Sequence, residues 1–431
     1  MHLHINPDRA EWPALLRRPV MDFAGLEARV APILAEVRDR GDAALRAFTA
    51  RFDGVDLDDL AVSPADMAQA ERELSESLRA AIALAARNIR AFHQAQATPE
   101  LRVETMPGVH CWRRSMPIER VGLYIPGGTA PLFSTILMLA IPAQVAGCKE
   151  LVLCTPPGKD GRVHPAIRYA AHLSGITQLF RVGGAQAIAA LAYGTESIPQ
   201  VYKIFGPGNQ YVTLAKQLVS REGVAIDMPA GPSEVAVVAD ATAQPAFLAA
   251  DLLSQAEHGI DSQVLLVTTA PGIAEATQIE VERQLASLPR KDIAREALSH
   301  SRVLVLRDED EAVDLINAYA PEHLILAVKN DEALADRIVN AGSIFLGHYT
   351  PESVGDYASG TNHTLPTNGF ARAYSGVSLD SFVKKITYQK LSPEGLQRLG
   401  PAVEEMATAE ELVAHRQAVS IRLAALKQDS D

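Results

Sequence analysis

The chain has 431 residues, more than a single hydrophobic core usually contains, so we expect at least two domains. Its composition, 48% hydrophobic and 21% charged, is typical of a soluble globular protein. The formal net charge of -12 makes nucleic acid and anionic membranes unsuitable partners.

Cysteine usage and the N-terminus indicate the compartment. Three cysteines, Cys111, Cys148 and Cys154, cannot form a disulfide framework, and their odd number suits a reducing environment. The first 20 residues are charged and lack the apolar run of a secretion signal. The most apolar stretch, residues 131–145, is too short to span a bilayer. We therefore expect a cytoplasmic protein with no membrane partner.

The first third of the chain predicts helices followed by a hairpin. Residues 21–52 and 65–95 have the spacing of amphipathic helices. Residues 101–124 are typical of an antiparallel pair of strands that turns at Pro107-Gly108.

From residue 131 onward, helices and strands alternate. This alternation predicts a parallel sheet with helices on both faces. The expected helices are 131–147, 165–174, 185–193 and 209–219, and the expected strands are 150–154, 178–182 and 200–205.

A second alternation begins at residue 244 and continues to Leu346, after an extended segment at 223–240. It predicts a second α/β unit, with helices at 244–258 and 272–288 and strands at 263–268 and 302–307. The remainder, residues 379–431, is predicted to be a charged helical tail.

Glycine-rich turns lie between predicted strands and helices of the first α/β unit. A GxGxxG fingerprint is absent. The sequences IPGG at 125–128, VGGA at 182–185 and FGPGN at 205–209 stand where ligands bind at the carboxyl edge of a parallel sheet. Any α/β protein needs tight turns at such positions, so only the three together favour a binding function.

The most informative stretch lies between residues 226 and 259. Residues 226–234, IDMPAGPSE, form a loop in which backbone can approach a ligand closely. Gln255 and His258 follow, three positions apart and so on one face of a helix that Gly259 would end. Two potential metal ligands beside this loop predict half of a site.

Other histidine-bearing segments could supply the second half. Glu322 and His323 place an acid and a base at a predicted helix-to-strand junction, where both can reach one cavity. The loop 355–363 contains Asp356 and His363 among Gly, Ser, Thr and Asn. A polar helix end and a surface turn are the ordinary alternatives for these two segments.

His415 is a weaker candidate, because a histidine near Glu410 on a tail helix is usually solvated. Nitrogen and oxygen ligands of the kinds found here suit zinc or manganese. A metal-dependent hydrolase that uses Glu322 and a metal-bound water is one alternative function, and an α/β binding protein without turnover is another.

The cysteines offer a third alternative, a Cys-dependent aldehyde dehydrogenase. Cys148 and Cys154 flank an apolar strand, where a cysteine is usually a small buried hydrophobe. Cys111 lies in a predicted strand. No helix start or basic cluster beside them would lower a thiol pKa.

Taken together and in this order, these motifs resemble the histidinol dehydrogenase family over nearly the whole chain. The specific part runs from Ile226-Asp227 through residues 230–234, AGPSE, to residues 250–258, ADLLSQAEH. The sequences YIPGG at 124–128, GPGN at 206–209 and PEHL at 321–324 also match the family's blocks.

The resemblance implies an α/β fold of two Rossmann-like parallel-sheet domains with short extensions. Residues 20–123 and 233–377 would form the first domain, with the metal and catalytic residues, and 124–232 the second, for NAD. Residues 1–19 would be an N-terminal extension. The helical tail 378–431 would reach the partner's site in a homodimer with shared active sites.

The resemblance also implies a ligand set. One zinc per subunit would be held by Gln255, His258, Asp356 and, from the partner, His415. NAD would contact Tyr124, Gln186 and Asn209. Besides the metal ligands, the substrate would touch Ser233, His323, His363 and Glu410.

The implied reaction oxidises L-histidinol through bound L-histidinaldehyde to L-histidine with two NAD+. His323 is suited to be the base, because its ordinary pKa lies near working pH. Glu322 can activate the water that hydrates the aldehyde before the second hydride leaves.

Overall fold

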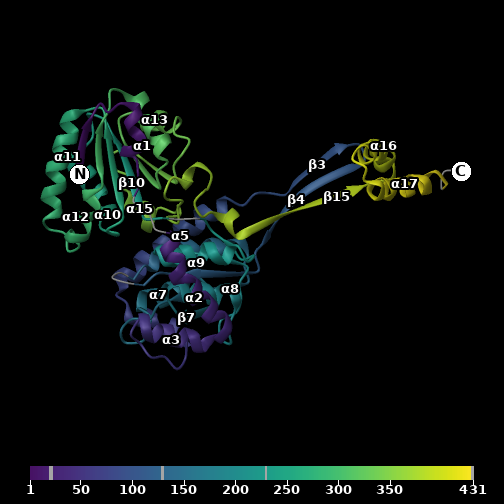
Figure 1. Ribbon diagram of the computed structural model, residues 1–431, viewed down its shortest axis with the longest axis horizontal. Helices are drawn as coiled ribbons and strands as arrows, with labels where there is room; N and C mark the ends of the chain where they lie inside the picture. Colours follow the sequence, from purple (N-terminus) through teal and green to yellow (C-terminus); the bar gives the residue numbers. More distant parts are fainter. Residues whose placement is uncertain (19–22, 128–130, 229–230, 429–431) are drawn as a thin grey trace. The chain divides into compact units, whose positions relative to one another are not determined.

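The computed structural model describes residues 1–18, 23–127, 131–228 and 231–428 (Figure 1). They form two compact units: residues 1–96 with 118–382, and residues 97–117 with 383–431. None of the helices in the described ranges is long and apolar enough to cross a membrane.

The first unit contains two six-stranded sheets. The sheet around β10, called the β10 sheet, has the order β1-β12-β11-β10-β13-β14, and all neighbouring strands are parallel. Its strands are β1 (His2–Ile5), β10 (Glu234–Ala239), β11 (Gln263–Thr268), β12 (Arg302–Val305), β13 (His323–Ala327) and β14 (Ser343–Leu346).

The second sheet, called the β5 sheet, has the order β2-β7-β6-β5-β8-β9. It is parallel except for the short β2, which runs antiparallel to β7. Its strands are β2 (Ala61–Val62), β5 (Arg120–Tyr124), β6 (Glu150–Thr155), β7 (Gln178–Arg181), β8 (Lys203–Phe205) and β9 (Ala225–Ile226). The predicted α/β fold with two parallel sheets is therefore confirmed.

Both faces of the β10 sheet are buried. Val235 and Val237 pack with the helices on one face, and Ala236 and Val238 with the helices on the other, as the two-residue period of a strand requires. The surrounding helices are α1 (Trp12–Leu15), α10 (Pro245–Ala256), α11 (Pro271–Leu285), α12 (Lys291–Ser299), α13 (Glu309–Tyr319), α14 (Asp331–Ala335) and α15 (Glu352–Tyr357).

The β5 sheet is also covered on both faces. One core contains α2 (Phe23–Arg40), α3 (Asp42–Phe52), α8 (Gly184–Tyr193) and α9 (Gln210–Ser220). The other contains α4 (Pro64–Gln69), α5 (Glu76–Ala95), α6 (Phe133–Ala146) and α7 (Pro165–Leu173). Short 3-10 turns complete the unit at η1 (Arg9–Glu11), η2 (Ala70–Glu73), η3 (Phe370–Arg372) and η4 (Leu379–Phe382).

This packing differs from the expected grouping of residues 20–123 with 233–377. Helices α2, α3 and α5 belong to the cores of the β5 sheet, and residues 120–124 form its central strand. The expected extension 1–19 also contributes β1, an edge strand of the β10 sheet. The single helix expected at 21–52 is interrupted at Gly41, whose φ is +52°; residues 21–22 lie outside the described ranges.

The second unit is a three-stranded antiparallel sheet with two helices. The hairpin of β3 (Leu101–Met106) and β4 (Val109–Pro117) confirms the predicted turn at Pro107-Gly108. The tail was expected to be helical, but it begins with β15 (Val383–Leu391), which pairs with β4. Helices α16 (Pro393–Ala409) and α17 (Val413–Gln428) follow.

Candidate functional site

A pocket of about 330 Å³ in the first unit gathers most of the predicted site residues. Pro126, Pro207 and Asn209 line it from beyond the carboxyl ends of β5 and β8. Other lining residues stand at the amino ends of β10, β11 and β13. Seven residues predicted for the metal, the substrate or catalysis line this pocket: Ser233, Gln255, His258, Glu322, His323, Asp356 and His363.

Three of these pocket residues and one neighbour form a potential metal centre. Ligand atoms of His258, Glu352 and Asp356 all lie within 4.8 Å of one another. Gln255 is buried beside them, in the last turn of α10. The helix ends at Ala256, so His258 is not on the helical face that its spacing predicted. A turn beyond the helix, with the His258 N–H 3.2 Å from the Gln255 carbonyl oxygen, brings it back to the cluster.

Glu352 was missed by the sequence interpretation. It lies four residues before Asp356 on α15, a spacing that places both carboxylates on one side of a helix. With its amide nitrogen facing Glu352, Gln255 donates a hydrogen bond to that carboxylate. Burial raises the pKa of Glu352 to about 8. The pair resembles a metal ligand held in orientation by a buried acid.

Glu322 and His323 are buried at the start of β13, confirming the predicted junction of helix and strand. Burial raises the pKa of Glu322 to about 8. Burial opposes a charge on His323, but the carboxylates of Glu352, Glu322 and Asp356 outweigh it and raise the histidine pKa well above its ordinary value. His323 Nε2 lies 3.5 Å from Asp356 Oδ1, so this nitrogen faces the cluster.

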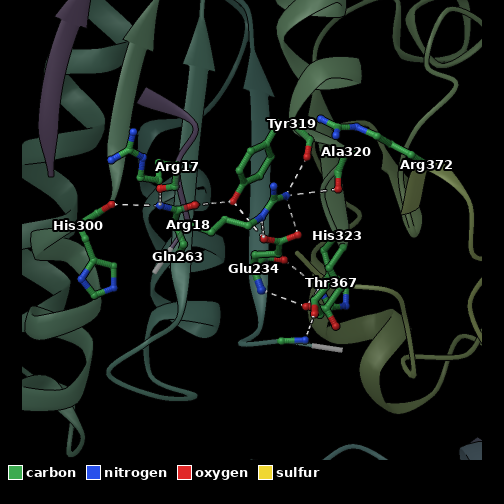
Figure 2. Close-up of polar contacts among 12 residues, drawn as sticks. Arg17, Arg18, Glu234, Gln263, His300, Tyr319, Ala320, His323, Thr367 and Arg372 are labelled. Atoms are coloured by element: carbon green, nitrogen blue, oxygen red, sulfur yellow. Dashed lines mark hydrogen bonds and ion pairs between the residues drawn. The ribbon is translucent and has the colours of Figure 1, made fainter. Parts of the chain in front are cut away.

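The backbone of Glu234 connects these two side chains. Its N–H donates to Glu322 Oε2 at 2.9 Å, and its carbonyl oxygen lies 3.3 Å from His323 Nδ1 (Figure 2). A proton on Nδ1 satisfies that carbonyl and leaves Nε2 as the basic nitrogen. The backbone of Glu234, the first residue of β10, thus orients the side chains of both Glu322 and His323.

His363 has two partners within the protein. Its Nδ1 lies 2.8 Å from the Asp356 carbonyl oxygen, and its Nε2 lies 3.1 Å from Thr135 Oγ1. Burial lowers its pKa, so the ring is neutral near pH 7. A neutral ring whose Nδ1–H donates to the Asp356 carbonyl accepts a hydrogen bond at Nε2 from the Thr135 hydroxyl.

A second pocket, of about 950 Å³, contains all three residues expected to contact NAD: Tyr124, Gln186 and Asn209. The Tyr124 hydroxyl accepts a hydrogen bond of 3.1 Å from the Gly184 N–H, and burial raises its pKa to about 12. Asn209 lines both pockets. A ligand extending from the larger pocket past Asn209 therefore reaches the smaller one.

A buried ion pair supports the turn between the pockets. Gly206 has a φ of +128°, and a Cβ there would lie 2.0 Å from the Tyr124 carbonyl oxygen, so the turn requires glycine. The Gly206 N–H donates to Asp227 Oδ2 at 2.9 Å, and Lys216 Nζ donates to the Gly206 carbonyl at 2.9 Å. Lys216 and Asp227 also pair with each other. The conformation of GPGN at 206–209 thus depends on the Asp227 of the quoted motif.

The cysteines have no part in either pocket. Cys154 packs in one core of the β5 sheet and Cys148 against the other, and burial raises the pKa of both thiols, that of Cys148 to about 11. Cys111 lies in β4 of the second unit. A thiol held protonated is a poor nucleophile, so the structure disfavours a thiohemiacetal mechanism.

Two predicted residues belong to the second unit. Glu410 ends α16 and His415 lies in α17, and both side chains are exposed within that unit. Their role in a partner's site stays a prediction. Gly128, Pro229 and Ala230 of the quoted motifs lie outside the described residues.

Comparison with known proteins gives one consistent result. The family model described as histidinol dehydrogenase matches residues 16–423. A histidinol dehydrogenase of Bacteroides fragilis is 59% identical over 428 residues, covering 99% of this chain and 100% of the relative. One from Yersinia pestis is 54% identical over 416 residues, covering 96% and 93%.

The fold gives the same result. The crystal structure of histidinol dehydrogenase from Elizabethkingia anophelis matches with a TM-score of 0.97 and 55% identity, covering 99% of both chains. The chain therefore belongs to the histidinol dehydrogenase family, NAD-dependent oxidoreductases of histidine biosynthesis that act on an alcohol and an aldehyde.

Proposed function

We propose that the smaller pocket binds L-histidinol and a divalent cation, and that the larger one binds NAD. The observation that carries the proposal is the convergence of seven predicted residues on one pocket that meets the cofactor pocket at Asn209. Histidinol plus two NAD+ and water would give histidine and two NADH.

The donor set fits a cation. The buried carboxyl groups of Glu322 and Glu352 lie near the half-buried Asp356, and burial keeps these two acids from ionising unless a positive charge compensates them. Gln255, His258 and Asp356 would hold zinc or manganese here, with His415 of the partner completing the set. The ion would neutralise these charges and bind the substrate's imidazole and amino nitrogens.

The protein groups divide into a base and a water activator. With a cation compensating the carboxylates that raise its pKa, His323 would be neutral and would take the hydroxyl proton at Nε2 as hydride leaves the alcohol carbon for bound NAD+. Glu322 then takes a proton from the water that adds to the aldehyde. His323 would return its proton to the aldehyde oxygen as the water adds, and it would then accept a second proton as the hydrated aldehyde loses its hydride and the carboxylate forms. A pKa raised by burial suits Glu322 to this work near neutral pH.

The test is NADH formation at 340 nm with L-histidinol and NAD+, before and after chelation. We expect turnover that a chelator removes and that zinc or manganese restores. No NADH from any metal-loaded form would contradict the proposed reaction. Full activity in protein verified as metal-free would contradict the cation site alone.

Glu322→Gln separates the two oxidations. Only the aldehyde needs an activated water, so we expect kcat with L-histidinaldehyde to fall by about 10²-fold or more. The loss of hydride transfer from histidinol should be smaller, measured as the first NADH in a single turnover. Equal losses in both half-reactions would contradict this role, and His323→Ala, which should impair both, is the matched control.

We further propose a homodimer in which α17 of one chain completes the site of the other. His323→Ala and His415→Ala should each be inactive. In a refolded equal mixture, half the dimers are mixed and carry one site without lesions, giving about a quarter of wild-type activity. An inactive mixture, with mixed dimers confirmed by mass, would exclude a shared site.

A further inference from the structure

Arg18 lies beside the catalytic residues but belongs to the N-terminal segment. Its guanidinium forms a two-pronged ion pair with Glu234, from Nε to Oε2 and from Nη2 to Oε1, the latter 2.9 Å long (Figure 2). The Arg18 side chain is 15% exposed and that of Glu234 is 2% exposed. The burial penalty on Arg18 is outweighed by Glu234, which raises the arginine pKa. The arginine therefore stays charged.

The same guanidinium also reaches the C-terminal end of α13. Nη2 donates to the carbonyl oxygens of Tyr319 at 2.8 Å and Ala320 at 3.4 Å. The carbon of the guanidinium lies 4.0 Å from the centroid of the Tyr319 ring, and the Tyr319 hydroxyl lies 3.3 Å from Glu234 Oε2. Arg18 therefore joins the first residue of β10 to the last residues before the catalytic pair.

The segment that Arg18 grips has an uncommon conformation. Ala320 has φ +53° and ψ +67°, the left-handed region, which a residue with a Cβ adopts only at a cost. This turn directs the chain from α13 into Pro321, Glu322 and β13. Hydrogen bonds to the carbonyls on both sides of it stabilise the turn.

We propose that Arg18 is a positioning residue for both oxidations. It holds Glu234 against the turn at 319–320, and so fixes the backbone groups of Glu234 that Glu322 and His323 share. The inference rests on the proposed function, because it assigns the two residues their work. It also gives the N-terminal segment, which lies far from β10 in sequence, a part in the reaction.

The test compares Arg18→Met with Arg17→Met, a neighbouring arginine whose side chain is exposed. For Arg18→Met we expect kcat to fall by about 10–10²-fold with histidinol and with histidinaldehyde alike, since a shift of about 1 Å at reacting groups has effects of this size. KM for both substrates should change less than about twofold, because the contacts that bind them remain. Arg17→Met should match wild type.

A purely structural role is separated by a double variant. Arg18→Met leaves Glu234 buried and unpaired, which lowers the melting temperature. Arg18→Met with Glu234→Gln removes that charge and should recover most of the melting temperature. It should not recover kcat, because methionine at position 18 supplies no donor to the carbonyls of Tyr319 and Ala320. Recovery of kcat together with stability would overturn the proposal, as would unchanged kcat in Arg18→Met.

Failure of the proposed function looks different. Wild-type protein that forms no NADH from histidinol would refute the reaction whatever the variants do. Active wild type with active Arg18→Met would refute only the positioning role.

Discussion

The two sheets of the first unit have the same strand order, yet they line the smaller pocket with opposite strand ends. The β5 sheet does so at its carboxyl ends and the β10 sheet at its amino ends. Each has a central strand, β5 or β10, flanked by a neighbour reached by a crossover, β8 or β13. In open parallel sheets, ligands usually bind beyond the carboxyl ends of these two strands. The β5 sheet follows this rule, with Tyr124 and the turn 206–209 at that edge. The β10 sheet does not, because its pocket residues stand at the amino ends.

A carboxylate bridges the carboxyl ends of β10 and β13, the ends of the β10 sheet that do not line the pocket. Asp240 directly follows β10, and its Oδ1 and Oδ2 accept 2.8 Å hydrogen bonds from the N–H groups of Thr242 and Lys329. Lys329 follows the end of β13, so Asp240 spans the crevice that a ligand would occupy. In the β5 sheet, Ile125 follows the central strand and Gly206 follows β8, and the residues just beyond them, Pro126, Pro207 and Gly208, line the smaller pocket. Asp240 thus bridges the strand ends on the side of the β10 sheet that lines neither of these pockets.

The largest expected effect on stability comes from the buried Lys216–Asp227 ion pair, which supports the turn 206–209 at the carboxyl end of the β5 sheet. Lys216→Met leaves Asp227 buried without its partner and the Gly206 carbonyl without a donor, so we expect a loss of about 3–5 kcal/mol in the free energy of unfolding. Lys149→Met is the control, because its pair with Glu119 is exposed and should be worth less than about 1 kcal/mol. Denaturant titration of both variants checks this. Similar losses would mean that the turn does not depend on the buried pair.

A smaller effect on stability is expected at Asp240, which bridges the carboxyl ends of β10 and β13. Asp240→Ala removes the acceptor for the N–H groups of Thr242 and Lys329, and should cost about 1–3 kcal/mol of unfolding free energy. NADH formation should stay at the wild-type rate, because these strand ends line neither pocket. Asp292→Ala, with an exposed side chain, should leave both quantities unchanged. A large loss of kcat in Asp240→Ala would show that the carboxyl ends of β10 and β13 take part in the reaction.

The smallest expected effect is a dependence of stability on pH, through an acid in the larger pocket at the carboxyl end of the β5 sheet. Asp53 lines the larger pocket, and burial raises its pKa from 3.8 to about 6. Between these values the folded state binds more protons than the unfolded state, so wild-type stability falls as pH rises from about 4 to 6. Asp53→Asn should therefore melt a few degrees above wild type at pH 7.5 and at the same temperature near pH 4. A difference independent of pH would assign the effect to another cause; Asp56→Asn, at an exposed position, is the control.

The sequence predicted most of the α/β elements because buried parallel strands are continuous apolar runs between helices. It did not predict β1 or β15. His2–Ile5 is short, and its pairing with β12 joins residues about 300 apart. β15 is rich in lysine and largely exposed, so it lacks the alternation of a half-buried strand. The sequence also did not predict that α2 and α5 pack on the β5 sheet, because this packing depends on contacts between residues far apart in the chain.

In the site, too, residues in short motifs could be predicted, whereas residues that act through distant contacts could not. Glu322, His323 and Asp356 could be predicted because their chemistry lies in short motifs. Glu234 was quoted in a motif without a role, since its part is played by backbone atoms. Arg18 gave no signal, because its partner lies 216 residues away.

The pairing of β1 with β12 has a consequence for synthesis. The strands of the β5 sheet are complete once residue 226 has left the ribosome, whereas the β10 sheet needs residue 346. His2–Ile5 and Arg18 are made first, but they must wait for residues 302 and 234 before they find their partners. The half that would bind the dinucleotide can therefore begin to fold while the catalytic half is still being translated, although Val377 and Phe382 join its core only later.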